Sequence, residues 1–278
     1  MKRIMTLQDS SCVGKCSLTV ALPIISAAGV ECGVLPTAVL SNHTAFPSFT
    51  FCDLTDEIAP ISDKLLELNI DFDAIYTGYL GSHRQLSLVR DFIERYGDKA
   101  TVVIDPVMAD NGKLYYGFTE EFAQSMAQLC SLADLVIPNL TEASFMLGIP
   151  YNPEYDEDYI KDVLKKLTDL GAKCAALTGI GFKDDEIGVY MYDSESGEYY
   201  HYFNEKLPAA FHGTGDVYAS ATVGAMMRGF TVSEALSIAV DYTLVTMKKT
   251  LADENHRFYG VNFEEALPLY VDRINKRK

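Results

Sequence analysis

The feature that most constrains the fold of this chain is the regular alternation of short apolar segments with longer amphipathic ones. Buried strands are predicted where runs are apolar or β-branched, at residues 2–8, 30–40, 74–77, 101–104, 134–137 and 173–178. Helices are predicted between them, at residues 16–28, 55–69, 85–96, 119–131 and 156–170. Such alternation requires crossover connections and a mostly parallel sheet that is covered on both faces. The sequence therefore predicts an α/β fold, a three-layer α/β/α sandwich.

The pattern changes in the last third of the chain. Residues 186–203 predict two strands joined by a turn at residues 194–197, which is typical of an antiparallel hairpin at one edge of the sheet. The segments that follow have helical spacing and cover residues 215–229, 232–249 and 263–275. We find no linker, repeat or low-complexity segment, and we therefore expect residues 1–278 to form a single domain.

The charge of the chain limits its partners. The formal net charge of the 278 residues is −16 at pH 7, whereas nucleic acids and anionic membranes require a basic face. We therefore expect neither as a partner. A nucleotide ligand is still compatible with this charge, because glycine loops, a metal ion and a few cations hold phosphates locally.

Composition also bears on the location of the protein. No apolar run approaches the roughly 18 residues that a membrane span requires, and the basic N-terminal segment is not followed by a signal-peptide core. The six cysteines are scattered through apolar contexts, which is typical of reduced thiols. We expect a cytoplasmic protein.

The strongest chemical signal is the segment His212-Gly213-Thr214-Gly215-Asp216, which directly precedes a predicted helix. The two glycines, Gly213 and Gly215, allow backbone N–H groups to turn toward an anion, and the helix adds the positive end of its dipole. A carboxylate at Asp216 suits the removal of a proton from an attacking hydroxyl group. We expect the dipole to keep this carboxylate ionised at neutral pH. The combination is typical of a small-molecule kinase.

Polar residues also follow several predicted strands, at the edge where ligands bind in open parallel sheets. Asp105 comes directly after one strand, and Asn139 and Glu142 follow the next. Taken singly, Asp105 fits a turn, while Asn139 and Glu142 fit a helix cap. Together they offer two carboxylates and an amide, which suit Mg²⁺ bound to nucleotide phosphates, partly through water. We therefore expect Asp105 and Glu142 near a magnesium ion.

His43 and Thr44 lie after a predicted strand and before an aromatic run at residues 46–51. A lone histidine is more often a surface or capping residue. Here, however, the pair offers hydrogen-bond donors and acceptors for a flat polar ring, next to faces on which the ring could stack. We expect this segment to bind the substrate.

Two other segments contain glycines that are typical of loops. The segment Gly14-Lys15-Cys16-Ser17 superficially looks like the phosphate loop of P-loop ATPases, but its upstream glycine is replaced by Asp9, and Cys16 stands where a Mg²⁺-binding hydroxyl is required. We reject that interpretation. The glycine-bounded segment 111–117 fits a mobile cover or an ordinary surface loop.

In order along nearly the whole chain, these motifs resemble the ribokinase-like superfamily, and within it the pyridoxal/pyridoxamine kinase family. Residues 213–216 resemble the anion hole and catalytic aspartate of the superfamily. Residues 105–110 resemble a strand end shared with hydroxymethylpyrimidine kinases, although Ala109 stands where glycine is usual, and residues 138–142 resemble the metal-and-phosphate segment. The segments that resemble pyridoxal kinases in particular are Ser41-Asn42-His43-Thr44 and Gly78-Tyr79-Leu80-Gly81.

The resemblance implies roles for these residues. It implies that His43, Thr44 and Tyr79 face a pyridine ring. It implies a nucleotide site made by Asp105, Asn139, Glu142, Thr178, Gly213 and Thr214. It also implies a homodimer, the use of ATP and Mg²⁺, and activation by a monovalent cation such as K⁺.

One segment departs from the pyridoxal kinase pattern. In many members a serine near the end of the first strand contacts the ring, whereas a gapless match puts Asp9 there, followed by Ser10. Asp9-Ser10-Ser11 is instead similar to hydroxymethylpyrimidine kinases. Either Asp9 or Ser10 is therefore the expected ring contact, and the preference among vitamers stays open.

We expect ATP-dependent phosphorylation of the 5′-hydroxymethyl group of pyridoxal, pyridoxamine or pyridoxine, in the salvage of pyridoxal phosphate. One alternative is a kinase of the same fold that acts on hydroxymethylpyrimidine or another small molecule. The other is a non-catalytic protein that binds a vitamer or a nucleotide.

Overall fold

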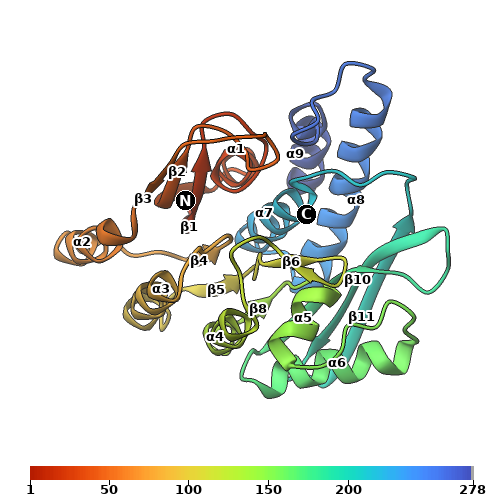
Figure 1. The fold of residues 1–278 in the computed structure, drawn as a ribbon, viewed down its shortest axis with the longest axis horizontal. Helices are drawn as coiled ribbons and strands as arrows, with labels where there is room; N and C mark the ends of the chain where they lie inside the picture. Colours follow the sequence, from red (N-terminus) through yellow and green to blue (C-terminus); the bar gives the residue numbers. More distant parts are fainter. Residues whose placement is uncertain (277–278) are drawn as a thin grey trace.

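The computed structural model describes residues 1–276, and its centre is a nine-stranded sheet in the order β11-β10-β9-β8-β5-β4-β1-β2-β3 (Figure 1). The strands of this sheet are β1 (Arg3–Ser11), β2 (Glu31–Leu40), β3 (Phe51–Asp53), β4 (Ala74–Thr77), β5 (Thr101–Ile104), β8 (Leu135–Val136), β9 (Cys174–Ile180), β10 (Glu186–Asp193) and β11 (Glu198–Glu205). The six central strands, β2, β1, β4, β5, β8 and β9, pair in parallel. The short β3 is antiparallel to β2 at one edge, and β10 and β11 form an antiparallel hairpin at the other. The predicted sheet and its edge hairpin are confirmed.

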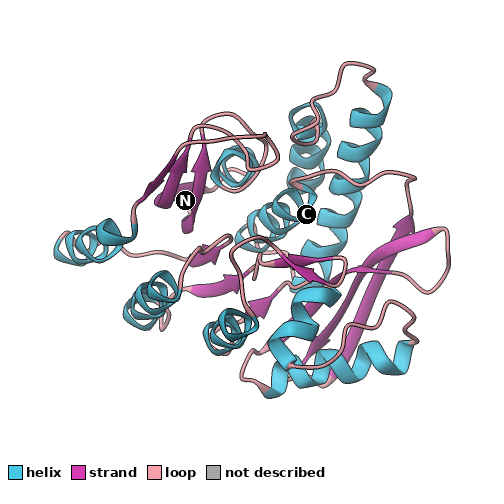
Figure 2. Cartoon of the chain, in the orientation of Figure 1, coloured by secondary structure: helices cyan, strands magenta, loops and turns pink. Residues whose placement is uncertain are grey.

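Helices cover both faces of the sheet, as Figures 1 and 2 show. One layer contains α2 (Thr55–Glu67), α3 (His83–Tyr96), α4 (Glu120–Cys130), α5 (Leu140–Leu147) and α6 (Glu157–Asp169). The other contains α1 (Leu18–Ala27), α7 (Thr214–Met227), α8 (Val232–Ala252), the short 3-10 helix η1 (Phe263–Ala266) and α9 (Leu267–Asn275). This is the predicted three-layer α/β/α sandwich.

Alternation along the strands divides the core in two. Ile4 packs with Val20 of α1 and Val217 of α7, whereas its neighbour Met5 belongs to the cluster on the α2–α6 side, which includes Phe92 of α3. Successive strand residues point to opposite faces, and both faces of a parallel sheet are buried under helices. The apolar runs that predicted the strands therefore fill two separate cores.

A smaller sheet lies outside this frame. The strands β6 (Ala109–Asp110) and β7 (Lys113–Leu114) form a short antiparallel hairpin beyond the end of β5. The segment expected as a loop at residues 111–117 thus begins in an ordered turn, with Gly112 at a φ of 75°. Among residues 1–276, no helix is both long and apolar enough to cross a membrane.

Candidate active site

The polar residues expected at the strand ends lie at one edge of the sheet. Asp9 belongs to the last part of β1, and the N–H group of Asp105, directly after β5, donates to the carbonyl oxygen of Thr77 at 3.0 Å. Asn139 follows β8 and forms a parallel bridge with Thr178 near the end of β9. These segments approach each other because the carboxyl ends of neighbouring parallel strands share an edge.

Four carboxyl groups meet at this edge: those of Asp9, Asp105 and Glu142, which are buried, and that of Asp216, which is half-buried. The pKa of Asp216 is raised to about 7, mainly because the carboxyl group is poorly solvated; a hydrogen bond from the Ser17 backbone N–H opposes this shift, and the charge of Asp9 adds to it. The pKa of Asp105 lies well above its ordinary value, because the group is buried and faces the charges of Glu142 and Asp216. Like charges that share a poorly solvated site disfavour ionisation of one another.

The prediction that the helix dipole alone keeps Asp216 ionised at neutral pH is therefore wrong. Asp216 does lie in the first turn of α7, as predicted. Poor solvation of the carboxyl group outweighs the favourable end of the dipole and raises the pKa of Asp216 to about 7, close to neutral pH.

Asn139 and Glu142 form a capping box at the start of α5. The Asn139 side chain accepts a hydrogen bond from the Glu142 N–H at 2.9 Å, and the Glu142 carboxylate accepts one from the Asn139 N–H at 2.9 Å. The same carboxylate accepts a bond from the N–H of Met108 at 3.1 Å, and the Asn139 amide donates to the carbonyl oxygen of Ala109 at 2.8 Å. The helix-cap interpretation is correct, and the cap also fixes the segment after Asp105.

Of the two carboxylates expected near a magnesium ion, Asp105 is better placed than Glu142 to bind one directly. Both oxygens of Glu142 already accept backbone hydrogen bonds, and burial raises the pKa of this residue to about 8. In the described part of the chain, no three His, Cys, Asp or Glu side chains are arranged to hold a metal by themselves. Asp105 is the better direct ligand, since a cation would offset the repulsion from Glu142 and Asp216. Mg²⁺ would take its other ligands from phosphates and water, as it commonly does.

The glycine turn before α7 is built for close approach of the backbone. Gly213 has a φ of 79°, and a Cβ atom at this position would lie 2.0 Å from the carbonyl oxygen of Lys15. No side chain caps the N-terminus of α7, and a Cβ on Gly215 would meet no atom within 4 Å. The first N–H groups of α7 therefore have no side-chain cap, and an anion could accept their hydrogen bonds. Thr214, the first residue of α7, is half-buried.

His43 lies beside this turn. Its ring is buried, and its centroid is 5.2 Å from that of His212, the residue before Gly213. The Nδ1 atom of His43 accepts a hydrogen bond from the N–H of Ala45 at 2.9 Å, so in the neutral ring the proton is on Nε2. Burial and the charge of His212 lower the pKa of His43. His43 is therefore a neutral donor at pH 7.

The other residues expected at the substrate lie around the same edge. Tyr79 follows β4 and is half-buried, and its pKa is raised by burial and by the charge of Asp9. Ser10 is half-buried and pairs with Val39 in the sheet, whereas Thr44 is exposed next to His43. Electrostatic contacts thus join Asp9 to Tyr79 and Asp216, and a ring contact joins His43 to the glycine turn.

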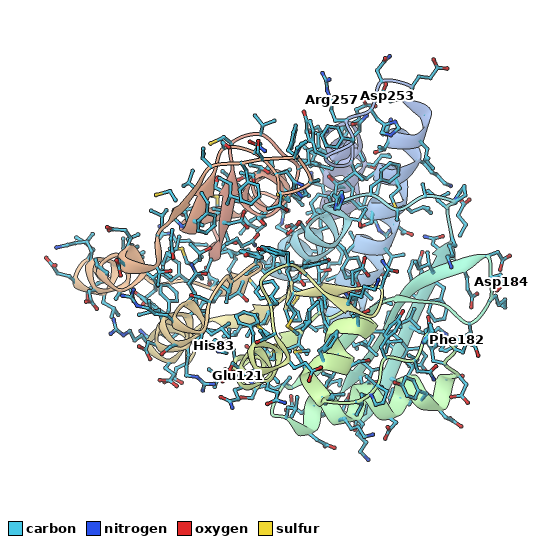
Figure 3. The ribbon with its side chains drawn as sticks, in the orientation of Figure 1. His83, Glu121, Phe182, Asp184, Asp253 and Arg257 are labelled. Carbon is cyan, nitrogen blue, oxygen red and sulfur yellow. The ribbon has the colours of Figure 1, made fainter. Side chains whose placement is uncertain are left out.

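Two further segments border the site. Phe46 stacks on Tyr259 at 5.2 Å and meets Phe258 edge to face at 4.8 Å, which ties the His43 loop to the loop after α8. Figure 3 labels Asp253 and Arg257 in this loop, at the upper end of the molecule. The second segment is the turn between β6 and β7, where the Gly112 N–H donates a hydrogen bond to the Thr141 hydroxyl at 3.0 Å.

Three residues of the site were not predicted from the sequence. Ser17 precedes α1 in an unusual backbone conformation, with a φ of 47° and a ψ of −129° and no side-chain capping bond, and it interacts with both Asp9 and Asp216. Tyr115 follows β7, and its pKa is raised by burial and by the charge of Glu142. Tyr76 is buried in β4 near Asp105 and Asp216. A serine before a buried helix was the only one of these signals visible in the sequence.

Known proteins resemble this chain over most of its length. Residues 26–260 match the family model described as phosphomethylpyrimidine kinase. A Bacteroides thetaiotaomicron structure named as a phosphomethylpyrimidine kinase, in a form with pyridoxal, is 38% identical, with a TM-score of 0.92 over 97% of this chain and 95% of that one. Pyridoxal kinase from Lactobacillus plantarum is 28% identical, with a TM-score of 0.91 over 98% and 97%. Pyridoxal kinase from Arabidopsis thaliana is 25% identical over 92% of this chain and 85% of its own length.

Proposed function

The chain belongs to the phosphomethylpyrimidine kinase family, ATP-dependent kinases of the ribokinase-like fold, and we propose that it phosphorylates the 5′-hydroxymethyl group of a vitamin B6 vitamer. The acceptor would be pyridoxal, pyridoxine or pyridoxamine, and the product the corresponding 5′-phosphate. Such a reaction would serve the salvage of pyridoxal phosphate.

The observation that carries this proposal is the contact between His43 and His212, with ring centroids 5.2 Å apart. It joins the segment expected to bind a flat polar ring to the turn expected to bind a phosphate. A ring held beside His43 and Thr44 would therefore have its hydroxymethyl group within reach of Asp216. The similarity to a 38% identical protein solved with pyridoxal supports the same choice of ring.

In the proposed reaction, the 5′-hydroxyl oxygen forms a bond to the γ-phosphorus of ATP as the bond from that phosphorus to the β,γ-bridging oxygen breaks. Asp216 takes the hydroxyl proton, and ADP leaves with the electron pair of the broken bond. The backbone N–H groups of Gly213 and Gly215 hold the charge on the transferred group, at the positive end of α7. A base whose pKa of about 7 is close to the working pH is efficient in this role.

The ring would be oriented by neutral groups. The Nε2–H of His43 donates a hydrogen bond toward an oxygen or nitrogen of the ring, since its Nδ1 is already occupied by Ala45. Thr44 would offer a hydroxyl, and Tyr79 would contact the ring together with Asp9 or Ser10. Of Asp9 and Ser10, the serine can both donate and accept a hydrogen bond.

ATP would lie along the outer part of the same edge. Thr178, Thr214 and Asn139 would contact the nucleotide, and Mg²⁺ would be held by Asp105 with Glu142 behind it. The ion supplies charge neutralisation for the triphosphate when it is bound. A monovalent cation such as K⁺ is part of the proposal because of the family resemblance alone.

A second acceptor, hydroxymethylpyrimidine, is favoured by two observations. The matching family model is described as phosphomethylpyrimidine kinase, and Asp9-Ser10-Ser11 is similar to such enzymes. The pyrimidine also carries a hydroxymethyl group on a flat nitrogen ring. The same base and glycine turn would serve either acceptor.

A panel of acceptors separates these possibilities. ATP consumption is measured with pyridoxal, pyridoxine, pyridoxamine and hydroxymethylpyrimidine at equal concentrations, with Mg²⁺ and K⁺ present, and the products are identified by mass spectrometry. We expect at least one B6 vitamer to be phosphorylated with a kcat/KM about tenfold or more above that of the pyrimidine. Phosphorylation of the pyrimidine alone would exclude the B6 proposal.

We also propose that residues 1–278 act as one domain in a cytoplasmic homodimer. Sedimentation velocity in dilute buffer tests the dimer directly. A species of twice the chain mass is expected at micromolar concentration, and a monomer at all concentrations would contradict it.

A further inference from the structure

The loop of residues 12–17 joins β1 to α1 and contains Lys15, a cation that the reaction described above does not use. The side chain of Lys15 is only 17% exposed. Lysine is seldom buried to this extent, because its ammonium group loses hydration on leaving water and then needs partners within the protein. The partners of Lys15 therefore indicate what this side chain does.

The Lys15 side chain contacts one segment near the C-terminus. Its ammonium group donates a hydrogen bond to Oδ1 of Asn262 at 3.3 Å and forms an ion pair with Glu264 at 2.9 Å. It also lies 5.8 Å from the ring centroid of Phe263, a cation–π distance. A Cβ atom on Gly260 would lie 2.4 Å from Cβ of Lys15, so the lysine stem packs directly on the glycine backbone. All four partners lie between the end of α8 and the end of η1.

The firmest of these partners is Asn262. This residue is buried, its N–H donates to the Thr250 hydroxyl at 2.8 Å, and its side-chain amide donates to Asp253 at 2.9 Å. Thr250 belongs to the last turn of α8, so Asn262 is fixed to a long helix. Glu264 is 53% exposed, and an ion pair with an exposed partner contributes little to stability. Lys15 is thus anchored mainly by Asn262 and by the packing of its stem.

The backbone of the same loop touches the groups proposed to transfer the phosphoryl group. A Cβ atom on Gly213 would lie 2.0 Å from the carbonyl oxygen of Lys15, so the glycine turn before α7 packs against the Lys15 backbone. Two residues further along the loop, the N–H of Ser17 donates a hydrogen bond to the Asp216 carboxylate. The position of the loop therefore affects both the turn and the base.

The first half of the loop touches the segment expected to bind the ring. The N–H of His43 donates to the carbonyl oxygen of Val13 at 2.8 Å, and a Cβ atom on Gly14 would lie 2.8 Å from Cβ of His43. The Thr19 hydroxyl lies 2.9 Å from the carbonyl oxygen of Gly14 and 2.7 Å from that of Cys16, which keeps the loop compact. One compact loop thus connects the ring-binding segment to the glycine turn.

We propose that Lys15 is a positioning residue, which fixes the 12–17 loop to the segment 260–264 so that the loop holds the Gly213 turn and the Asp216 carboxylate in place for phosphoryl transfer. The inference rests on the proposed function, which gives the turn and the carboxylate their roles. In this role Lys15 touches neither the acceptor nor ATP. Its ammonium group acts through the backbone of its own loop.

Kinetics of Lys15→Met test this role. The substitution keeps an unbranched stem against Gly260 and removes the ammonium group. We expect kcat to fall about tenfold, while KM for the vitamer and for ATP stays within about threefold, because misalignment of the reacting groups mainly slows the chemical step. Lys15→Arg keeps the charge and can donate to Asn262, so its kcat should return to within about threefold of that of the unmodified protein.

Lys248→Met is the matched control. Lys248 also forms an ion pair, with Glu205, in a contact that joins α8 to β11 and not to the 12–17 loop. Since this variant removes the same charge elsewhere, its kcat should stay within about twofold of that of the unmodified protein. An unchanged kcat in Lys15→Met, or equal losses in both variants, would exclude the positioning role. A KM for ATP raised more than about tenfold at an unchanged kcat would make Lys15 a nucleotide ligand instead.

A double-mutant cycle on stability tests the same contact without the reaction. Gly213→Ala directs a methyl group at the Lys15 carbonyl oxygen, and the loop can move aside only where it is not anchored. Gly213→Ala should therefore lower the Tm less in the Lys15→Met background than in the unmodified protein, by about 2 °C or more. Gly197→Ala, whose Cβ would meet no atom within 4 Å, should lower the Tm equally in both backgrounds.

The two failures are distinguishable. Absence of phosphorylation of any acceptor by the unmodified protein would remove the proposed function, and the Tm cycle would still decide whether Lys15 anchors the loop. Additive Tm changes for Lys15→Met and Gly213→Ala would overturn the anchoring role in a fully active kinase.

Discussion

Asp216 experiences two opposing influences, and their balance sets its chemistry. The first turn of α7 and the Ser17 N–H favour its ionised form, whereas burial and the charge of Asp9 favour the protonated form. The sequence predicted the first influence, because a carboxylate at a helix N-terminus is visible as a local pattern. It could not predict the second, since the approach of β1 to α7 is a tertiary contact between residues about 200 positions apart.

The pH dependence of the reaction should follow this residue. A proton acceptor works in its ionised form, so kcat/KM for the vitamer should rise about tenfold per pH unit below about 7 and level off above it. Initial rates between pH 5.5 and 9 in a constant-ionic-strength buffer measure the profile. A flat profile down to pH 5.5 would contradict a base with a raised pKa.

Replacement of the base gives a second prediction at this scale. Asp216→Asn keeps the size and polarity of the side chain but cannot take up a proton. We expect turnover to fall by about 10²–10⁴, with the Kd of the vitamer and of ATP largely kept. Isothermal titration calorimetry and single-turnover kinetics measure the two parts. Near-normal turnover would remove Asp216 from the mechanism.

At the scale of elements, the site depends on short segments that carry little sequence signal. The strands β6 and β7 have two residues each, and α5 has eight. None of these three elements is long enough to show a periodic hydrophobic pattern in the sequence. The strand β3 has three residues, all of them exposed, and is too short for a recognisable pattern. The long helices α3, α6 and α8 were predicted to within about four residues, because each buries an amphipathic face. Alternation of strands and helices therefore revealed the frame but not the small elements at its edge.

The turn before α7 allows a direct test of an element. Gly213→Ala would require an alanine at a φ of 79° and place its Cβ 2.0 Å from the carbonyl oxygen of Lys15. The matched control is Gly197→Ala in the β10–β11 turn, with a φ of 73° and no atom within 4 Å of its Cβ. The control should lose about 1–2 kcal/mol of stability through backbone strain alone. Gly213→Ala should lose more and also lower kcat at least tenfold.

Denaturant unfolding and steady-state kinetics of both variants measure the difference. Equal losses of stability with full activity in Gly213→Ala would show that the turn tolerates displacement from Lys15. The account of a rigid phosphate-binding turn would then be wrong.

At the scale of the whole molecule, the fold concentrates buried carboxylates at one edge of a chain that is already acidic. The pKa of Asp216 is raised to about 7 and that of Glu142 to about 8, in both cases mainly by burial, and the pKa of Asp105 lies well above its ordinary value, also mainly because of burial. Each of these groups binds its proton more tightly in the folded than in the unfolded state. Their ionisation therefore destabilises the fold.

Stability should decrease as the pH rises from about 6.5 to 8.5. This pH range lies above the pKa values that the carboxyl groups have in the unfolded chain, and it includes the raised pKa values of Asp216 and Glu142 in the folded protein. The lowered pKa of His43 keeps this residue from contributing. We expect the Tm to fall between pH 6.5 and pH 8.5, and to fall less steeply in Asp216→Asn. We also expect ATP with Mg²⁺ to raise the Tm more at pH 8.5 than at pH 6.5. Scanning calorimetry measures the slopes. A Tm that rises with pH in all samples would contradict the buried carboxylate cluster.

The account as a whole requires that the first and last thirds of the chain meet at one substrate. A crystal structure of the complex with pyridoxal and a non-hydrolysable ATP analogue tests this most directly. We expect Thr44 and Asp216 to contact the same pyridoxal molecule, with its 5′-oxygen about 2.6–3.2 Å from the Asp216 carboxylate. A pyridoxal bound elsewhere, or bound with its 5′-oxygen directed away from Asp216, would contradict it.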